Sequence, residues 1–162
     1  MKNNICISIS EKPGNFGKII HNAGYEELGL DWVYIPFKIT NLENTIKGIR
    51  ALNIRGCSVS MPFKEKVIPF LDEIDYLAKK IGSVNTIVND DGILKGYNTD
   101  FIGFQKSFKK LHVLKHEKIL ILGSGGVAKS ILVGLKNLKL KNIYICSRNF
   151  RNTKKLALKF NV

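Results

Sequence analysis

A glycine-rich turn between an apolar run and a helical pattern constrains this chain more than any other stretch. Residues 119–122 are all large and apolar without alternation, which predicts a strand buried on both faces of a parallel sheet. Gly123 permits a sharp turn, Gly125 leaves room for a pyrophosphate, and Ala128 lets the following helix lie close to the strand. The pattern G-x-G-x-x-A at the start of a helix predicts a dinucleotide-binding turn. Its expected contact residues are Gly123, Ser124, Gly125, Gly126, Val127 and Ala128.

The next predicted strand, residues 142–146, supports this interpretation. It ends in Ser147, Arg148 and Asn149, about 20 residues after the glycines. Proteins that bind NAD usually place Asp or Glu there, to accept a hydrogen bond from the ribose 2′-OH, whereas an arginine suits a 2′-phosphate. NADP is therefore the expected cofactor, with Ser147, Arg148 and Asn149 among its contacts. The structural alternative is a tight strand-to-helix turn followed by solvated basic residues.

The same residues allow a second interpretation. Residues 123–130 also match G-x-x-x-x-A-K-S, one residue away from the phosphate loop of nucleotide hydrolases, with Lys129 and Ser130 placed for a β-phosphate and magnesium. Ala128 is the mismatch, because a glycine normally completes the backbone cradle there. No later apolar strand ends in Asp to hold the metal. The hydrolase is therefore the weaker hypothesis.

Length and composition predict a globular protein. The 162 residues suffice for one ordinary domain or two small ones, and a hydrophobic content of 44% can fill a core. No apolar run approaches the roughly 18 residues of a membrane span, and the first residues lack the layout of a signal peptide, so we expect a cytoplasmic protein without a membrane partner. Cys6, Cys57 and Cys146 lie far apart in apolar runs, which predicts small buried thiols.

The formal charge of +13 raises the question of a nucleic-acid partner. The lysines are scattered through nearly every segment, without a basic helix, an aromatic stacking platform or zinc-finger spacing. A lysine-rich composition with solvated faces explains the charge, and no nucleic acid is expected. His112 and His116 are only half of a metal site, so no metal site is predicted either.

Before the glycine turn, strand-like and helical patterns alternate. A strand at the start is followed by a helical face that Gly29 closes, a second strand, a helix that Asn41 caps, and a third strand. This order predicts parallel pairing with right-handed crossovers. The expected ranges are 4–10, 16–28, 32–37, 41–52 and 55–60.

Polar residues follow the third strand, where open α/β sheets bind their ligands. Ser60 and Lys64 stand there, and Pro62 suits the first turn of a helix. Residues 83–88 and 93–97 flank Asn-Asp-Asp-Gly, which predicts a hairpin. A helix over residues 101–111 follows, and we expect the domain boundary near Asp100.

Four motifs in the same order resemble the shikimate dehydrogenase family. They are SVSMPFKE at residues 58–65, GSVNTIV at 82–88, GYNTDFIGF at 96–104 and GSGGVAKS at 123–130. The resemblance implies an α/β fold with a parallel or mixed substrate-binding sheet over residues 1–100 and an incomplete NADP-binding Rossmann domain over 101–162. It also implies reversible NADP-dependent reduction of 3-dehydroshikimate to shikimate, on the way to chorismate and the aromatic amino acids.

The resemblance assigns roles to single residues. Lys64 and Asp100 would be the catalytic pair, while Ser60 and Asn85 would contact substrate hydroxyl or carboxylate groups. Reduction of a ketone builds negative charge on its oxygen, so a lysine that donates a proton and a carboxylate that orients it fit this chemistry. Without the motifs, each residue also has an ordinary structural explanation, Lys64 as a solvated lysine, Asp100 as a helix cap and Asn85 as a strand-edge amide.

Two departures from the family pattern concern the ligands. The serine pair that grips the shikimate carboxylate in the family falls on Asn15 and Gly17, and only Asn15 can donate a hydrogen bond. The chain therefore resembles the shikimate-dehydrogenase-like branch, and its substrate is expected to be shikimate or a related hydroxy acid. The family's Asn-Arg-Thr motif is Ser147-Arg148-Asn149 here, and Arg151 or Lys154 is expected to supply the second charge.

The ending is the largest departure. A dinucleotide sheet is built from two βαβαβ halves, and this sequence stops at Val162 after two strands. The absent part would carry the nicotinamide pocket, a substrate-binding glutamine and helices that pack back on the first domain. We therefore expect a truncated relative with weak or no turnover, whose second half is marginal. A non-catalytic protein that binds a hydroxy acid or a partner stays open, as do a homo-oligomer and a second polypeptide that completes the fold.

Overall fold

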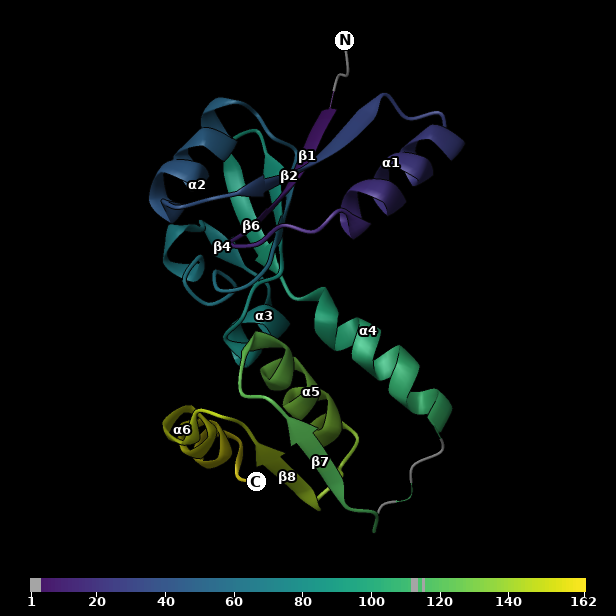
Figure 1. The fold of residues 1–162 in the computed structure, drawn as a ribbon, viewed down its shortest axis with the longest axis vertical. Helices are drawn as coiled ribbons and strands as arrows, with labels where there is room; N and C mark the ends of the chain where they lie inside the picture. Colours follow the sequence, from purple (N-terminus) through teal and green to yellow (C-terminus); the bar gives the residue numbers. More distant parts are fainter. Residues whose placement is uncertain (1–3, 112–113, 115) are drawn as a thin grey trace. The chain divides into compact units, whose positions relative to one another are not determined.

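The computed structural model describes residues 4–111, 114 and 116–162 and has an α/β fold, which confirms the expected class (Figure 1). The contacts between residues divide the chain into two compact units. The first comprises the residues up to Lys79 together with Val84–Tyr97. The second comprises Lys80–Ser83 and Asn98–Val162.

The first unit is built on one mixed sheet of six strands. The third strand in chain order lies beside the first, and both the second and the third run parallel to it, as the alternation of strands and helices predicts. The fifth strand is antiparallel to the third and to the sixth. In sheet order the strands are β2 (Trp32–Lys38), β1 (Asn4–Ser10), β3 (Gly56–Val59), β5 (Thr86–Asp90), β6 (Ile93–Tyr97) and β4 (Glu73–Ile74).

Local sequence signals explain the helices and the hairpin of this unit. Helix α1 (Phe16–Glu27) is followed by Gly29 at φ +62°, and Asn41 caps α2 (Leu42–Ala51) by accepting a hydrogen bond from the Asn44 amide at 2.9 Å. The turn between β5 and β6 uses Asp91 at φ +49° and Gly92 at φ +90°, a backbone that Asp and Gly tolerate. The predicted hairpin is therefore confirmed in type and place.

Helix α2 and the sheet enclose the apolar core of the first unit. Its members come from strands β1, β3, β5 and β6, from α2 and from the segment after β3, so the core joins elements far apart in the sequence. Burying side chains of this size contributes about 1.5 to 3 kcal/mol each. Fully buried examples are Ile9, Ile49, Val67, Ile87 and Leu94.

The segment between β3 and β5 differs from its prediction. No α-helix begins at Pro62, whose peptide bond with Met61 is cis. Turns lead instead to a short 3₁₀-helix, η1 (Ile68–Phe70), then to β4 and finally to α3 (Tyr76–Ile81). The two-residue strand β4 carries no periodic signal, because alternation needs several residues to become visible.

The second unit places three helices around a pair of parallel strands. Helix α4 (Thr99–Phe108) continues into the 3₁₀-helix η2 (Lys109–Leu111), and then β7 (Ile119–Leu122), α5 (Gly126–Asn137), β8 (Ile143–Cys146) and α6 (Phe150–Phe160) follow in order. One core joins these elements. Its buried members include Ile121, Ala128, Leu132, Leu135 and Leu156.

Only one face of the two-stranded sheet is covered within this unit. Leu120, Leu122 and Tyr144 on the other face are 60%, 79% and 52% exposed. The prediction that residues 119–122 are buried on both faces is therefore wrong for this structure, because no described element of the unit covers the outer face. No helix among the described residues has the length and apolarity needed to cross a membrane.

Close packing between α4 and α5 predicts opposite effects for two glycines. A methyl group at Gly134 of α5 would lie 2.6 Å from Cδ1 of Phe104 on α4, whereas one at Gly103 of α4 meets no described atom within 4 Å. We expect Gly134→Ala to lower the free energy of unfolding by about 1 to 3 kcal/mol through overpacking. Gly103→Ala should raise it by up to about 1 kcal/mol through helix propensity.

Chemical denaturation of both variants and the parent chain measures these changes. The pair is matched, because each variant adds one methyl group to a helix of the same unit. Equal effects of the two substitutions would contradict the close approach of α4 and α5.

Candidate functional site

The glycine turn has the backbone that a phosphate contact requires. Gly123 has a φ of +126°, and its amide donates to the Cys146 carbonyl at 2.8 Å, which ties the turn to the end of β8. Gly125 is the N-cap of α5, and a methyl group built on it meets no described atom within 4 Å. The first turn of α5 holds no acidic residue. The start of this helix therefore has space and no acidic side chain to oppose an anion, and the phosphate contact itself stays a prediction.

A chain of hydroxyl groups joins the turn to the end of β8. The Ser124 and Ser147 Oγ atoms are 2.9 Å apart, and Ser147 Oγ lies 2.6 Å from Oγ1 of Thr153 on α6. Thr153 was not predicted from the sequence, and its side chain is almost wholly buried. These contacts hold the two segments that carry the predicted cofactor residues next to each other.

The residues beside Ser147 have separate roles. Asn149 caps α6 by accepting from the Asn152 amide at 3.0 Å, so its side-chain oxygen is already engaged. Arg148 is exposed and forms no ion pair with any described residue. A guanidinium in this position is available to a phosphate at the carboxyl end of the strand.

The rival phosphate-loop interpretation does not agree with the position of Ser130. Its side chain is fully buried, and its Oγ donates to Asn98 Oδ1 at 3.1 Å, with the Gly126 carbonyl 3.3 Å away. A phosphate-loop serine must present its hydroxyl to a metal ion at the ligand. Ser130 instead serves the contact between α4 and α5.

Three predicted residues of the first unit come together at one edge of its sheet. Ser60 follows β3, and its amide donates to the Ile9 carbonyl at 2.9 Å. The Lys64 carbonyl accepts from the Val84 amide at 2.8 Å, directly before Asn85. The Asn85 carbonyl in turn accepts from the Val59 amide at 2.8 Å. These backbone bonds bring Ser60, Lys64 and Asn85 to the carboxyl end of β3, where Lys64 and Asn85 are half-buried and Ser60 is exposed.

The loop that carries Asn15 ends near the same edge. Glu11 donates its amide to the Met61 carbonyl at 3.2 Å, next to Ser60. Asn15 is the exposed N-cap residue of α1, and its side chain makes no capping bond. The side-chain amide of Asn15 is therefore not used as a helix cap and is open to a ligand.

Tyr34 is a residue that sequence reasoning missed. A methyl group built on Gly17 would lie 3.3 Å from the Tyr34 hydroxyl oxygen. The phenol of Tyr34 thus occupies the space beside the position where the family pattern has a serine. The sequence carries a weak signal for it, since Tyr34 is an inward residue of β2, but the approach of α1 to β2 is a tertiary contact.

Asp100 lies in the first turn of α4, in the second unit, and is half-buried. The N-cap of this helix is Asn98, so the reading of Asp100 as the cap itself is wrong. Lys64 belongs to the first unit and Asp100 to the second. The catalytic role of this pair stays a prediction.

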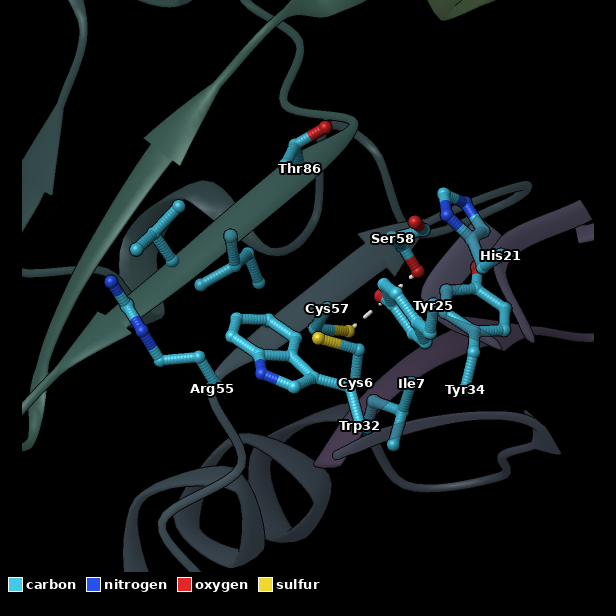
Figure 2. Close-up of a pocket in the computed structure, with 13 residues that line it drawn as sticks. Cys6, Ile7, His21, Tyr25, Trp32, Tyr34, Arg55, Cys57, Ser58 and Thr86 are labelled. Atoms are coloured by element: carbon cyan, nitrogen blue, oxygen red, sulfur yellow. Dashed lines mark hydrogen bonds between the residues drawn. The ribbon is translucent and has the colours of Figure 1, made fainter. Parts of the chain in front are cut away.

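A cavity of about 290 Å³ lies within the first unit (Figure 2). Figure 2 shows Cys6 and Tyr25 in the middle of its lining, with Trp32 and Arg55 on one side and His21 and Tyr34 on the other. The rings of His21 and Tyr34 are stacked with centroids 4.4 Å apart. Asn15, Ser60, Lys64 and Asn85 do not line this cavity. Tyr34, the neighbour of Gly17, does line it, so the cavity adjoins the position where the family pattern has a serine.

Metal ligands are not gathered anywhere in the described part of the chain. No group of three or more His, Cys, Asp and Glu residues there could hold a metal ion. His112, one of the two histidines considered from the sequence, lies outside the described residues.

Comparisons with known proteins agree with the motifs. Residues 16–87 match the family model of the shikimate dehydrogenase substrate binding domain. A shikimate dehydrogenase-like protein of Haemophilus influenzae is 48% identical over 153 residues, which cover 94% of this chain and 56% of that protein. Shikimate dehydrogenase (NADP(+)) of Halothermothrix orenii is 44% identical over 142 residues, or 85% of this chain and 49% of the relative.

A solved structure extends the likeness to both units. The crystal structure of a shikimate dehydrogenase in complex with NADP+ is 36% identical and superposes with a TM-score of 0.88, over 98% of this chain and 56% of that one. The chain thus spans about half the length of the relatives that it matches. The resemblance drawn from the four motifs is confirmed.

The different burial of the three cysteines predicts that they react with alkylating reagents at different rates. Cys6 and Cys57 are buried, as expected, but Cys146 is exposed, because it lies on the uncovered face of β8. Burial raises the pKa of the Cys57 thiol, so almost none of it is thiolate near neutral pH. We expect iodoacetamide to alkylate Cys146 in the native protein well before Cys57, and peptide mass spectrometry to show this order. Equal labelling in the folded state would contradict the burial of β3.

Proposed function

Because this chain is a relative of the shikimate dehydrogenases, we propose that it binds NADP and a shikimate-like hydroxy acid and carries the residues of an NADP-dependent dehydrogenase. The observation that carries the proposal is the convergence of Ser60, Lys64 and Asn85 on one sheet edge through backbone hydrogen bonds. This edge is where an open α/β sheet binds its ligand.

The cofactor part of the proposal rests on the glycine turn. The backbone of Gly123, Gly125 and Gly126 would hold the pyrophosphate at the start of α5, where space is open and no acidic side chain stands in the first turn. The Arg148 guanidinium would bind the 2′-phosphate that separates NADP from NAD. Ser124 and Ser147 would complete the contact surface through their linked hydroxyls.

The substrate part rests on polar groups at the edge of the first sheet. Asn15 and the Tyr34 hydroxyl would donate hydrogen bonds to the carboxylate of the hydroxy acid. Ser60 and Asn85 would hold its hydroxyl groups, and the Thr86 hydroxyl donates to Asn85 Oδ1 at 2.9 Å, which fixes the orientation of that amide. Hydrogen-bond donors on two sides of the bound hydroxy acid would determine which of its carbon atoms faces the cofactor.

In the proposed reaction, Lys64 would transfer the proton and Asp100 would orient the reacting groups. NADPH supplies a hydride to the carbonyl carbon when it is bound. Lys64 would donate a proton from Nζ to the carbonyl oxygen as negative charge builds there, and in the reverse direction it would accept that proton. The Asp100 carboxylate would orient the ammonium group and the reacting hydroxyl. The proposal requires both side chains to reach the same substrate.

A second candidate is a non-catalytic protein that binds the hydroxy acid, NADP or a partner protein. The exposed Leu120, Leu122 and Tyr144 favour a partner protein, because an uncovered apolar sheet face is a typical protein-binding surface. Binding of either small molecule without turnover distinguishes this candidate from the dehydrogenase.

Arg148 should decide between the two nicotinamide cofactors. We expect Arg148→Ala to weaken NADP binding by roughly 10-fold to 100-fold, the size of a charge-assisted hydrogen bond, and to leave NAD binding unchanged. Isothermal titration calorimetry of the whole chain measures both. Lys141→Ala is the matched control, since Lys141 is an exposed cation at the opposite end of β8. Equal losses for NADP and NAD would argue against a 2′-phosphate contact.

Lys64 should decide whether the chain is an enzyme. We expect slow NADPH-dependent reduction of 3-dehydroshikimate, and a loss of roughly 100-fold or more on Lys64→Ala, the usual contribution of a general acid. Lys66→Ala removes an exposed lysine of the same loop and is the control. Absorbance of NADPH at saturating substrate follows the reaction. Ligand binding with no turnover in the parent chain would favour the non-catalytic candidate instead.

A further inference from the structure

We propose that Asn98 and Ser130 are positioning residues that fix the N-terminus of α4, and with it Asp100, against the helix of the glycine turn. The inference rests on the proposed role of Asp100. Its structural basis is a buried polar network that lies entirely within the second unit. Neither residue belongs to the predicted cofactor or substrate contacts.

Asn98 uses both ends of its side-chain amide. Its Oδ1 accepts from the Phe101 amide at 3.2 Å, which makes Asn98 the N-cap of α4, and it also accepts from Ser130 Oγ at 3.1 Å. Its Nδ2 donates to the Ser83 carbonyl at 2.8 Å. Asn98 is only 3% exposed. An ordinary N-cap needs the first of these bonds alone, so the other two must serve a further purpose.

Ser130 of α5 is the partner of Asn98 in this contact between the two helices. It lies one turn after Gly126, the residue at which the glycine turn becomes helix, and its Oγ also lies 3.3 Å from the Gly126 carbonyl. Ser130 is fully buried. An alanine would suit the middle of a buried helix better, because serine competes for backbone hydrogen bonds. The hydroxyl is accounted for by its bond to Asn98.

The packing around this bond leaves little freedom. Gly134, one helical turn further along α5, lies against the Phe104 ring, and a methyl group there would approach to 2.6 Å. Helices α4 and α5 therefore meet at two points on one side, a close glycine contact and a buried hydrogen bond. A satisfied polar bond inside such an interface selects one register between the helices, because sliding would leave buried polar atoms unpaired.

This register determines where Asp100 stands. Asp100 is two residues beyond Asn98 in the first turn of α4, while Gly126 is four residues before Ser130. The hydrogen bond between the side chains of Ser130 and Asn98 thus connects the glycine turn to the helix that carries the proposed catalytic carboxylate. The bond sets the place of Asp100 relative to the cofactor turn without contacting either ligand.

Hydrogen exchange of the Phe101 amide tests the inference in the 162-residue chain. Ser130→Ala should raise the Phe101 exchange rate about fivefold, since one hydrogen bond contributes about 1 kcal/mol. The Asn152 amide is the internal control: Asn149 caps α6 in the same unit through the same kind of bond at 3.0 Å, and the exchange rate of Asn152 should stay within about twofold. NMR spectroscopy resolves both amides.

Kinetics provides the readout that a purely structural role would not change. Ser130→Ala should lower kcat by roughly 10-fold to 100-fold, as a misplaced catalytic group does, with the KM for NADPH within about twofold of the parent value. Asn98→Ser, which keeps a good cap but lacks the amide, should act in the same direction. Asn41→Ser at the exposed cap of α2 is its matched control and should change neither quantity.

The outcomes separate this inference from the proposed function. A parent chain without turnover would count against the dehydrogenase, and the contrast between Phe101 and Asn152 would still decide whether the bond holds α4. Unchanged Phe101 exchange in Ser130→Ala would overturn the inference. A parallel rise at Phe101 and Asn152 with a lower melting temperature would overturn it as well, because Ser130 would then contribute only to general stability.

Discussion

The first unit depends on the backbone hydrogen bonds between the loop after β3 and the start of β5. The Val84 amide reaches the Lys64 carbonyl at 2.8 Å, and the Val59 amide reaches the Asn85 carbonyl at the same distance. Buried backbone groups need partners, so the loop cannot move away from β5 without losing them. Because these partners adjoin the proposed site residues, the fold and the site are stabilised by the same bonds.

The second unit meets a different constraint, since its sheet has two strands among the described residues. Its core forms on one side, where Leu132, Leu135 and Leu156 are buried. The other side leaves Leu120 and Leu122 to solvent. The hydrogen bond of Ser130 and the close contact of Gly134 join α5 to α4, so helix contacts and strand pairing together hold this unit.

Local signals made much of the fold predictable, and tertiary contacts limited the rest. The Asp91-Gly92 turn and the Asn41 cap were predictable because a few neighbouring residues determine both structures. The supposed helix at Pro62 was wrong, since the bonds of that loop are made with distant residues such as Val84. For the site, motifs located Ser60, Lys64 and Asn85, whereas Tyr34 was missed because its neighbour Gly17 lies on another element.

The glycine turn shows that a sequence motif must be checked against the burial of its residues. The same eight residues, 123–130, fit a dinucleotide turn and nearly fit a phosphate loop, and the two interpretations differ in what Ser130 does. A hydroxyl with no exposed surface, bonded to Asn98 and near the Gly126 carbonyl, cannot also hold a metal ion at the ligand. The residues that favoured the hydrolase therefore form a contact between helices, and the groups proposed to bind an anion are the glycine amides and Arg148.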